Sequence, residues 1–226
     1  MAKTHVIIPV LFFTILLVAC NGGGSGSALL YSENFDEGNS CFDSNAMDIG
    51  ALSIENGELI LEITEPYSLY WDTCEEVTLT NFTIELDMYD DTSGEGFHFY
   101  GLQLRSGSED GGPDQYYVVR FGMGEGISSA SCVGFANENS FEDITKSPSG
   151  DSCWVDLPEP IHPGQWNHFE ITLDGPMITY KVNDVHVASI NDARLTQGSF
   201  ALLAGTHDED SARIKFDNIR ITALDE

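Results

Sequence analysis

Short alternations of apolar and polar residues recur from Ala28 to the end of the chain. Residues 82–89 alternate regularly, and residues 58–63, 166–173 and 177–182 repeat the same two-residue period. Such a period places every second side chain on one face of a β-strand. No later stretch shows a convincing helical period, so the pattern predicts an all-β domain.

Turn signals at close spacing separate these runs. Asn56 and Gly57 stand between two alternating runs and predict a tight β-hairpin. Residues 174–176 and 183–184 predict two further turns. About ten to twelve short strands with this spacing favour a single two-sheet sandwich over residues 29–226.

Two irregular features interrupt the pattern. In residues 212–222 the apolar phase slips by one residue, which predicts a β-bulge at Asp217 and Asn218. Residues 122–156 are rich in glycine and acidic residues, and they predict a long loop insertion. Long loops on a rigid sandwich commonly carry binding sites.

The N-terminal region has a different pattern. Lys3 precedes an apolar run over residues 6–19, which has the length of a signal-peptide core and is shorter than the roughly 20 residues of a spanning helix. The run ends on Ala19 and Cys20, which resembles the lipobox of bacterial lipoproteins. The resemblance implies cleavage after residue 19 and diacylglycerol attachment to Cys20. The alternative is an ordinary secretory signal.

The segment after the lipobox supports the lipoprotein interpretation. Residues 20–28 are mainly glycine and serine and form a flexible tether. With residues 1–19 as signal peptide, we expect an extracytoplasmic, membrane-anchored lipoprotein. The anchor would lie in the outer membrane of a diderm bacterium, or on the outer face of the cell membrane of a monoderm.

The charge balance excludes several partners. Asp and Glu number 37 against 9 Lys and Arg, which gives a formal net charge of -28. Such a chain repels phosphate backbones, so nucleic acid is not an expected partner and membrane contact is expected through the lipid anchor only. Hydrophobic residues at 42% and aromatic residues at 11% are sufficient for a packed core and argue against disorder.

The cysteines agree with export. With Cys20 acylated, four remain, and an even number in an exported chain predicts two disulfides with three possible connectivities. We favour Cys41–Cys74 and Cys132–Cys153, because each pair closes a loop between flanking strands. Zinc is not expected, since no CxxC motif or paired histidine supports it.

Short motifs in the folded part resemble the signposts of concanavalin A-like or laminin G-like jelly rolls. The motifs are Tyr31-Ser-Glu-Asn-Phe35, Asn56-Gly-Glu-Leu59, Gly164-Gln-Trp-Asn167, Lys181-Val-Asn183 and Phe216-Asp-Asn-Ile219. The nearest likeness is to the bacterial 3-keto-disaccharide hydrolase family, over residues 29–223. It implies an all-β jelly-roll sandwich of two antiparallel sheets. These motifs mark the fold and carry no catalytic residue.

Glu85 and Asp87 are the candidate catalytic residues. Their strand is similar to the E-x-D-x-(x)-E strand of family 16 glycoside hydrolases, in which two carboxyl groups about 5 Å apart act on the glycosidic bond. The third position does not fit, because Tyr89 stands at i+4 and the shorter Asp90 at i+5. The alternative is a half-buried strand whose polar side chains face solvent.

Four aromatic residues are candidates for carbohydrate binding. Tyr67, Tyr70, Trp71 and Trp154 are expected in or beside loops, where their rings could cover the apolar face of a sugar. Neighbouring polar groups would then bind the sugar hydroxyls. The alternative is that these rings cap the core at the ends of the sandwich.

Glu33 and Asp217 are candidates for a structural calcium ion. Jelly-roll carbohydrate modules often hold calcium near the first and last strands, and the resemblance implies these two residues. Calcium takes six to eight oxygen ligands, which acidic loops can supply. The alternative is solvated surface charge.

The sequence leaves three functions open. We expect a surface-tethered lipoprotein whose sandwich binds carbohydrate or another surface polymer. The alternatives are a glycoside hydrolase or lyase of the 3-keto-disaccharide type, and a structural or adhesive lipoprotein with a protein partner. An enzyme requires carboxylates with raised pKa values in a cleft, whereas a binding module requires exposed aromatic rings.

Overall fold

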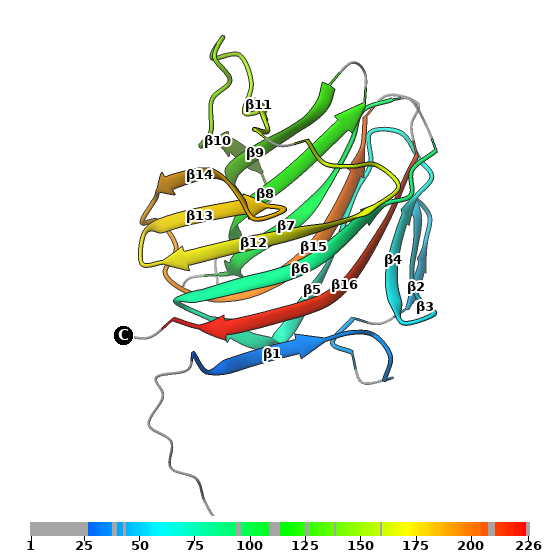
Figure 1. The fold of residues 1–226 in the computed structure, drawn as a ribbon, viewed down its shortest axis with the longest axis horizontal. Helices are drawn as coiled ribbons and strands as arrows, with labels where there is room; N and C mark the ends of the chain where they lie inside the picture. The colour runs from blue at the N-terminus through cyan, green and yellow to red at the C-terminus, as the bar shows by residue number, and fades with distance from the viewer. Residues whose placement is uncertain are drawn as a thin grey trace, which may run out of the picture.

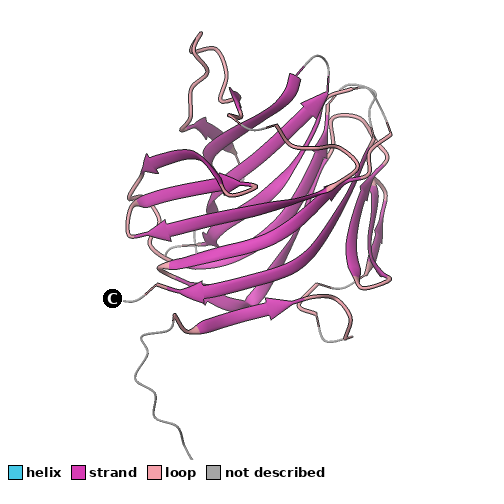
Figure 2. Ribbon diagram, viewed as in Figure 1, coloured by secondary structure: helices cyan, strands magenta, loops and turns pink. Residues whose placement is uncertain are grey.

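The computed structural model contains sixteen strands in the part of the chain that it describes, and no helix (Figure 2). Within that part, no helix is therefore long and apolar enough to cross a membrane. The fold is the all-β architecture that the alternation predicts. The predicted signal peptide and Cys20 lie outside the described residues, which are 27–37, 40–42, 44–93, 96–108, 114–124, 127–137, 139–158, 160–207 and 211–224.

The strands form two antiparallel sheets, stacked as two layers (Figure 1). Sheet A has nine strands. Eight of them follow the order β14 (Val185–Asn191), β13 (Met177–Val182), β12 (Trp166–Asp174), β6 (Phe82–Asp90), β16 (Ala212–Ala223), β4 (Glu58–Ile63), β3 (Gly50–Glu55) and β2 (Asn45–Met47). The ninth, β1 (Leu29–Glu33), also pairs with β16. Sheet B has seven: six in the order β10 (Ser140–Asp143), β9 (Ile127–Asn137), β8 (Gln115–Gly124), β7 (His98–Gly107), β15 (Gly198–Thr206) and β5 (Leu69–Leu79), and β11 (Val155–Asp156), which also pairs with β9.

One hydrophobic core fills the space between the sheets. Every second residue of β6, from Phe82 to Met88, is fully buried in it. Sheet B contributes Tyr100, Leu102 and Leu104 of β7 from the other side. Each such side chain contributes roughly 1.5–3 kcal/mol by leaving water, so the two-residue period selects which face of each strand turns inward.

The predicted hairpins and bulge are present. Asn56 and Gly57 join β3 to β4 with φ of 56° and 79°, and Asn183 and Asp184 join β13 to β14 with φ of 49° and 66°. Turns with two positive φ values match the right-handed twist of the flanking strands. The register of β16 against β6 shifts after Asp217, as the slip in apolar phase predicts.

Both predicted disulfides are formed. Cys41–Cys74 joins the segment before β2 to β5 in the other sheet, with Cα atoms 5.3 Å apart. Cys132–Cys153 joins β9 to the segment before β11, with Cα atoms 4.9 Å apart. In the chain-entropy model, a disulfide that closes a loop of this length stabilises the folded state by about 3–4 kcal/mol.

The prediction of a loop over residues 122–156 is wrong in its first half. β8 continues to Gly124, β9 pairs with β8 along its length, and β10 pairs with β9. The strand period is hidden because the outward positions of β9 carry small residues, which give no apolar alternation. These outward residues are Ala130, Cys132, Gly134 and Ala136.

Candidate functional site

The outer face of sheet B carries side chains of very different size. One row of register partners crosses it from β5 to β9: Trp71, Leu203, Gly101, Arg120 and Cys132. These residues alternate with core residues, so they point away from the core. Gly101, in the middle of the row, has no side chain, whereas Trp71 and Arg120 carry large side chains on either side of it.

A groove of about 830 Å³ lies on this face, a volume typical of small-molecule sites. Trp71 and Thr73 of β5 line one side, and Tyr116 of β8 and Asn137 of β9 line the other. Gln103 of β7, which is only 1% exposed, contributes to the floor between them. The Trp71 ring is 45% exposed, so a ligand in the groove could contact it.

Polar groups also line the groove. Gln103 and Asn137 offer amide groups, and Glu75 and Asp114 offer carboxylates. The Asn137 side-chain oxygen accepts hydrogen bonds from the backbone N–H of residue 139 at 2.9 Å and from Ser140 Oγ at 3.0 Å, which fixes its orientation. An apolar ring with convergent polar groups is the usual composition of a ligand-binding site.

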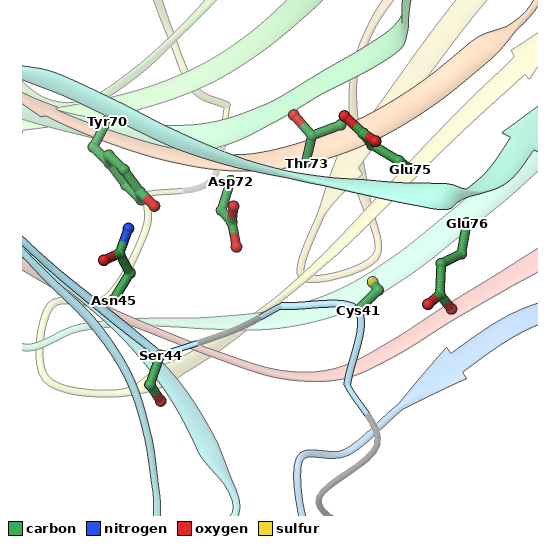
Figure 3. A pocket seen from close by; sticks show the side chains of 8 residues that line it. All are labelled: Cys41, Ser44, Asn45, Tyr70, Asp72, Thr73, Glu75 and Glu76. Carbon is green, nitrogen blue, oxygen red and sulfur yellow. The ribbon is translucent and has the colours of Figure 1, made fainter.

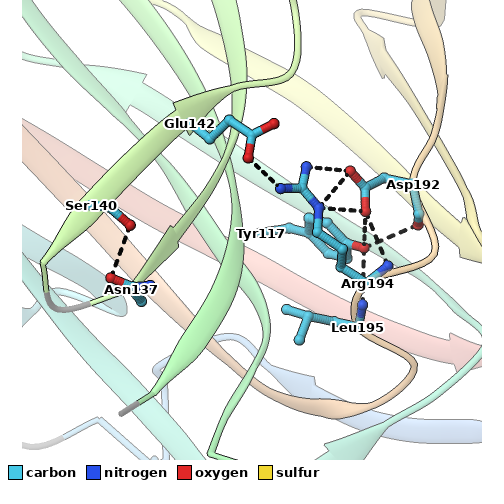
Figure 4. A network of polar contacts seen from close by, with 7 residues as sticks. All are labelled: Tyr117, Asn137, Ser140, Glu142, Asp192, Arg194 and Leu195. Carbon is cyan, nitrogen blue, oxygen red and sulfur yellow. Dashed lines mark hydrogen bonds and ion pairs between the residues drawn. The ribbon is translucent and has the colours of Figure 1, made fainter.

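The segment before β15, which lines one end of the groove, is held by a polar network (Figure 4). The Tyr117 hydroxyl donates to Asp192 Oδ1 at 2.8 Å and accepts from the Leu195 N–H at 3.1 Å. Arg194 donates to the Asp192 carboxylate and, at 2.7 Å, to Glu142 Oε2 of β10. Hydrogen bonds from Arg194 lower the pKa of Asp192 to about 2, and burial raises the pKa of Tyr117 to about 12.

An aromatic cluster covers the neighbouring part of the same face. Its ring centroids lie 5.0–6.5 Å apart where they pack together around Trp154 and Phe97. A Cβ atom on Gly134 or Gly205 would overlap a ring of the cluster, so the rings lie directly against the sheet backbone. The members of the cluster are Phe97, Phe99, Phe141 and Trp154.

The structure brings two of the four predicted aromatic residues to this face. Trp71 lines the groove, and Trp154 lies in the aromatic cluster. The prediction that Trp71 stands in or beside a loop is wrong, because it lies within β5. β5 is an edge strand with acidic residues on both faces, so its sequence shows no clear alternation.

The other two aromatic residues lie elsewhere. Tyr70 also lies within β5, where it points to the opposite side and lines a second cavity of about 390 Å³ with Asn45 and Asp72 (Figure 3). Burial, followed by the Asp72 charge, raises the pKa of Tyr70. Tyr67 precedes β5 and is 70% exposed, with its ring 5.0 Å from the ring of His207.

Glu85 and Asp87 lie on the outer face of sheet A, and neither lines either cavity. Oδ1 of Asp87 forms a hydrogen bond with Nδ1 of His168 at 2.9 Å. Oδ2 of Asp87 accepts a hydrogen bond from Nδ2 of Asn218, also at 2.9 Å. Asp90 is turned to the other side of β6, where it is buried and bonds a histidine 2.7 Å away. The third carboxylate of a family 16 site therefore does not share their face.

The calcium candidates remain a prediction. Glu33 Oε1 accepts two backbone N–H groups at 3.0 and 2.8 Å, and burial raises the pKa of Asp217. Among the described residues, one group of three ligand-type atoms lies within 4.8 Å, from Cys132, Asp143 and Cys153. Its two sulfur atoms are bonded to each other, so the carboxylate is the one ordinary metal ligand in it.

Comparison with known proteins identifies the family. A family model described as the 3-keto-alpha-glucoside-1,2-lyase-like domain matches residues 31–222. The chain belongs to this family. The 3-keto-alpha-glucoside-1,2-lyase-like domain thus spans every described strand except for the ends of β1 and β16. No curated protein matches the sequence.

Solved structures share the fold of this 3-keto-alpha-glucoside-1,2-lyase-like domain. The κ-carrageenase of Pseudoalteromonas carrageenovora has a TM-score of 0.62 at 11% identity, covering 92% of this chain and 99% of its own. The laminarinase catalytic domain of Thermotoga maritima MSB8 has a TM-score of 0.60 at 14% identity, covering 88% and 99%. The carbohydrate-binding module CBM66 of Bacillus subtilis has a TM-score of 0.50 at 14% identity, covering 80% and 91%. The jelly-roll prediction is confirmed.

Proposed function

We propose that this 3-keto-alpha-glucoside-1,2-lyase-like domain binds a carbohydrate chain in the groove on the outer face of sheet B. The observation that carries the proposal is the half-exposed Trp71 ring beside a groove whose floor includes the buried Gln103 amide. Family membership supports a sugar ligand, since the family description names a glucoside.

The groove can supply both kinds of contact that a sugar requires. A pyranose ring has an apolar face, which Trp71 could cover, and a rim of hydroxyls, which the amides of Gln103 and Asn137 could bind. Because the Tyr117–Asp192–Arg194 network fixes one end of the groove, little ordering would be needed on binding.

The domain is proposed to act outside the cell, tethered through acylated Cys20. Support comes from the lipobox-like sequence and from the Gly/Ser-rich tether that follows it. Replacing the anchor by Cys20→Ser should move the protein from membrane fractions to soluble extracytoplasmic fractions. Retention in the membrane would contradict the lipoprotein proposal.

A second candidate function is glycoside cleavage in the same groove. Two observations favour it: the lyase-like description of the family, and the carboxylates of Glu75 and Asp114 among the groove-lining residues. Carboxylates are the usual acid and base groups in sugar cleavage. Release of sugar product distinguishes this function from binding alone.

The test is a glycan-binding panel with the full chain, measured by calorimetry with calcium and with chelator, and with product analysis in the same samples. Trp71→Ala should weaken binding by about tenfold or more, because it removes the exposed aromatic surface. Trp166→Ala is the matched control, since this Trp is 41% exposed but lies on β12 of sheet A.

Four results of the panel separate the functions. Saturable, Trp71-dependent binding without product supports carbohydrate binding, and product release supports the enzyme. Equal losses in the Trp71 and Trp166 variants would contradict the assignment of the groove. Absence of binding to every glycan would contradict the proposed function and favour a protein partner.

A further inference from the structure

Arg120 is a partly buried cation with unusual partners. Its guanidinium lies 4.3 Å from the Phe141 ring centroid, 5.1 Å from that of Phe99 and 5.4 Å from that of Trp154. Nη2 donates to Cys132 Sγ at 3.0 Å, and sulfur is a weak acceptor. Among the residues that the structure describes, no group forms a hydrogen bond with the buried Nε atom. Burial lowers the pKa of Arg120 to about 10, so the group is still charged at neutral pH.

Three other arginines of the domain form hydrogen bonds or ion pairs with oxygen atoms. Arg194 and Arg213 each bond two carboxylates, and Arg105 bonds three backbone carbonyls. Within the described residues, Arg120 has no hydrogen bond to a carboxylate, although Asp143 is near enough to favour its charge. A buried charge without an oxygen partner is costly, and a partner supplied by a ligand would recover that cost.

Arg120 does not line the groove, but it lies on the same outer face of sheet B. It lies in the same register row as Trp71, separated from it by Leu203 and Gly101. On its own strand, Tyr116 lines the groove and interacts electrostatically with Arg120. The surrounding rings restrict water near the guanidinium, which strengthens any charge–charge contact made there.

We propose that the carbohydrate chain in the groove is an acidic polysaccharide, and that it extends over the same face of sheet B to Arg120, which binds its carboxylate or sulfate groups. This inference rests on the proposed carbohydrate-binding function. The net charge of -28 repels anions in general, so an acidic ligand needs one local cation with strong, short-range contacts. A guanidinium meets that need because it can bind an oxyanion through two parallel hydrogen bonds.

The experiment uses ligand pairs that differ in charge alone. Oligogalacturonides are compared with their methyl esters, and κ-carrageenan oligosaccharides with their desulfated forms, by calorimetry on the full chain. We expect the acidic member of at least one pair to bind about tenfold or more tightly than its neutral partner. The pair that shows the preference identifies the anion as carboxylate or sulfate.

Variants assign the preference to Arg120. Arg120→Met removes the charge at similar volume and should abolish the preference for the acidic member. Arg120→Lys keeps a charge and should retain part of the preference, which provides a readout if the Met variant does not fold. Lys215→Met, on sheet A, is the control and should leave the preference unchanged.

The failure of this inference differs from the failure of the proposed function. Trp71-dependent binding with equal affinity for acidic and neutral partners overturns the acidic-ligand inference alone. Survival of the preference in a folded Arg120→Met variant overturns the role of Arg120. Absence of binding to any glycan overturns both proposals.

Discussion

The outer faces of the two sheets are built from different kinds of residue. On sheet A, polar and charged side chains bond one another, as in Asp87 with His168 at 2.9 Å and Lys181 with Glu170 at 2.8 Å. On sheet B, Gly134 and Gly205 lie directly beneath rings of the aromatic cluster, and the groove and Arg120 lie on the same face. The comparison teaches that clustered carboxylates in an acidic domain do not by themselves mark a site. Exposed aromatic surface and unsatisfied polar groups next to a cavity are the better guide.

The largest expected loss of stability comes from adding a side chain at Gly101, on the outer face of sheet B. A Cβ atom in Gly101→Ala would overlap the carbonyl oxygen of Val119 on β8, so backbone must move. We expect a loss of about 3 kcal/mol in the free energy of unfolding, together with weaker glycan binding. Urea denaturation of the variant and wild type measures the loss.

The matched control for this change lies on sheet A. Thr172→Ala removes one hydroxyl bond, to Thr83 Oγ1 at 2.9 Å, from the outer face of that sheet. Its cost should be within about 1 kcal/mol. An equal loss of unfolding free energy in the two variants would show that the packing of Gly101 against β8 is not tightly constrained.

A smaller effect is expected from the network beside the groove. Hydrogen bonds from Arg194 lower the pKa of Asp192 from 3.8 to about 2, so its carboxylate stabilises the fold fully above about pH 4. Asp192→Asn should cost about 1 kcal/mol at pH 7, since partial exposure weakens the pair.

The pH dependence tests the cause of that cost. As the pH falls from 4 towards 2, wild-type Asp192 takes up a proton, so the difference in unfolding free energy between wild type and variant should shrink. Thermal unfolding at pH 7, 4 and 2.5 measures this difference. A constant difference across the range would show that the ion pair is not its source.

The smallest change in stability is expected from removing the charge of Asp87 on sheet A. Asp87→Asn keeps the size of the side chain and should change unfolding free energy by no more than about 0.5 kcal/mol. Glycan affinity and any product release should be unchanged, as measured in the same panel. Loss of product release in this variant would instead make Glu85 and Asp87 the catalytic candidates and reverse the comparison of the two faces.

Much of the fold follows from local sequence. Strand β6, the turn at Asn56 and Gly57 and the bulge after Asp217 are fixed by alternation and turn chemistry, which act over a few residues. Strands β5 and β9 were not predicted, because an acidic edge strand and a strand of small residues both lack large apolar residues at every second position.

The site was predicted only in part. Trp71 and Trp154 were recognised as aromatic candidates, but their shared face depends on pairings between distant segments, such as Trp71 with Leu203. Gln103, Tyr116 and Arg120 were missed for the same reason. A single charged residue between Val119 and Phe121 of an apolar strand is expected to face away from the core, and that signal could have marked Arg120 as outward-facing.

The Cys41–Cys74 disulfide has a mechanical consequence under the proposed N-terminal tether. A pull on the tether loads β1 first, and β1 is held to β16 by a short ladder of four register pairs. Once those pairs separate, the force passes through Cys41 to Cys74 on β5, three residues from Trp71. When a ligand held in the groove resists the pull, the covalent bond thus carries tension from the proposed tether directly to the strand that lines the groove.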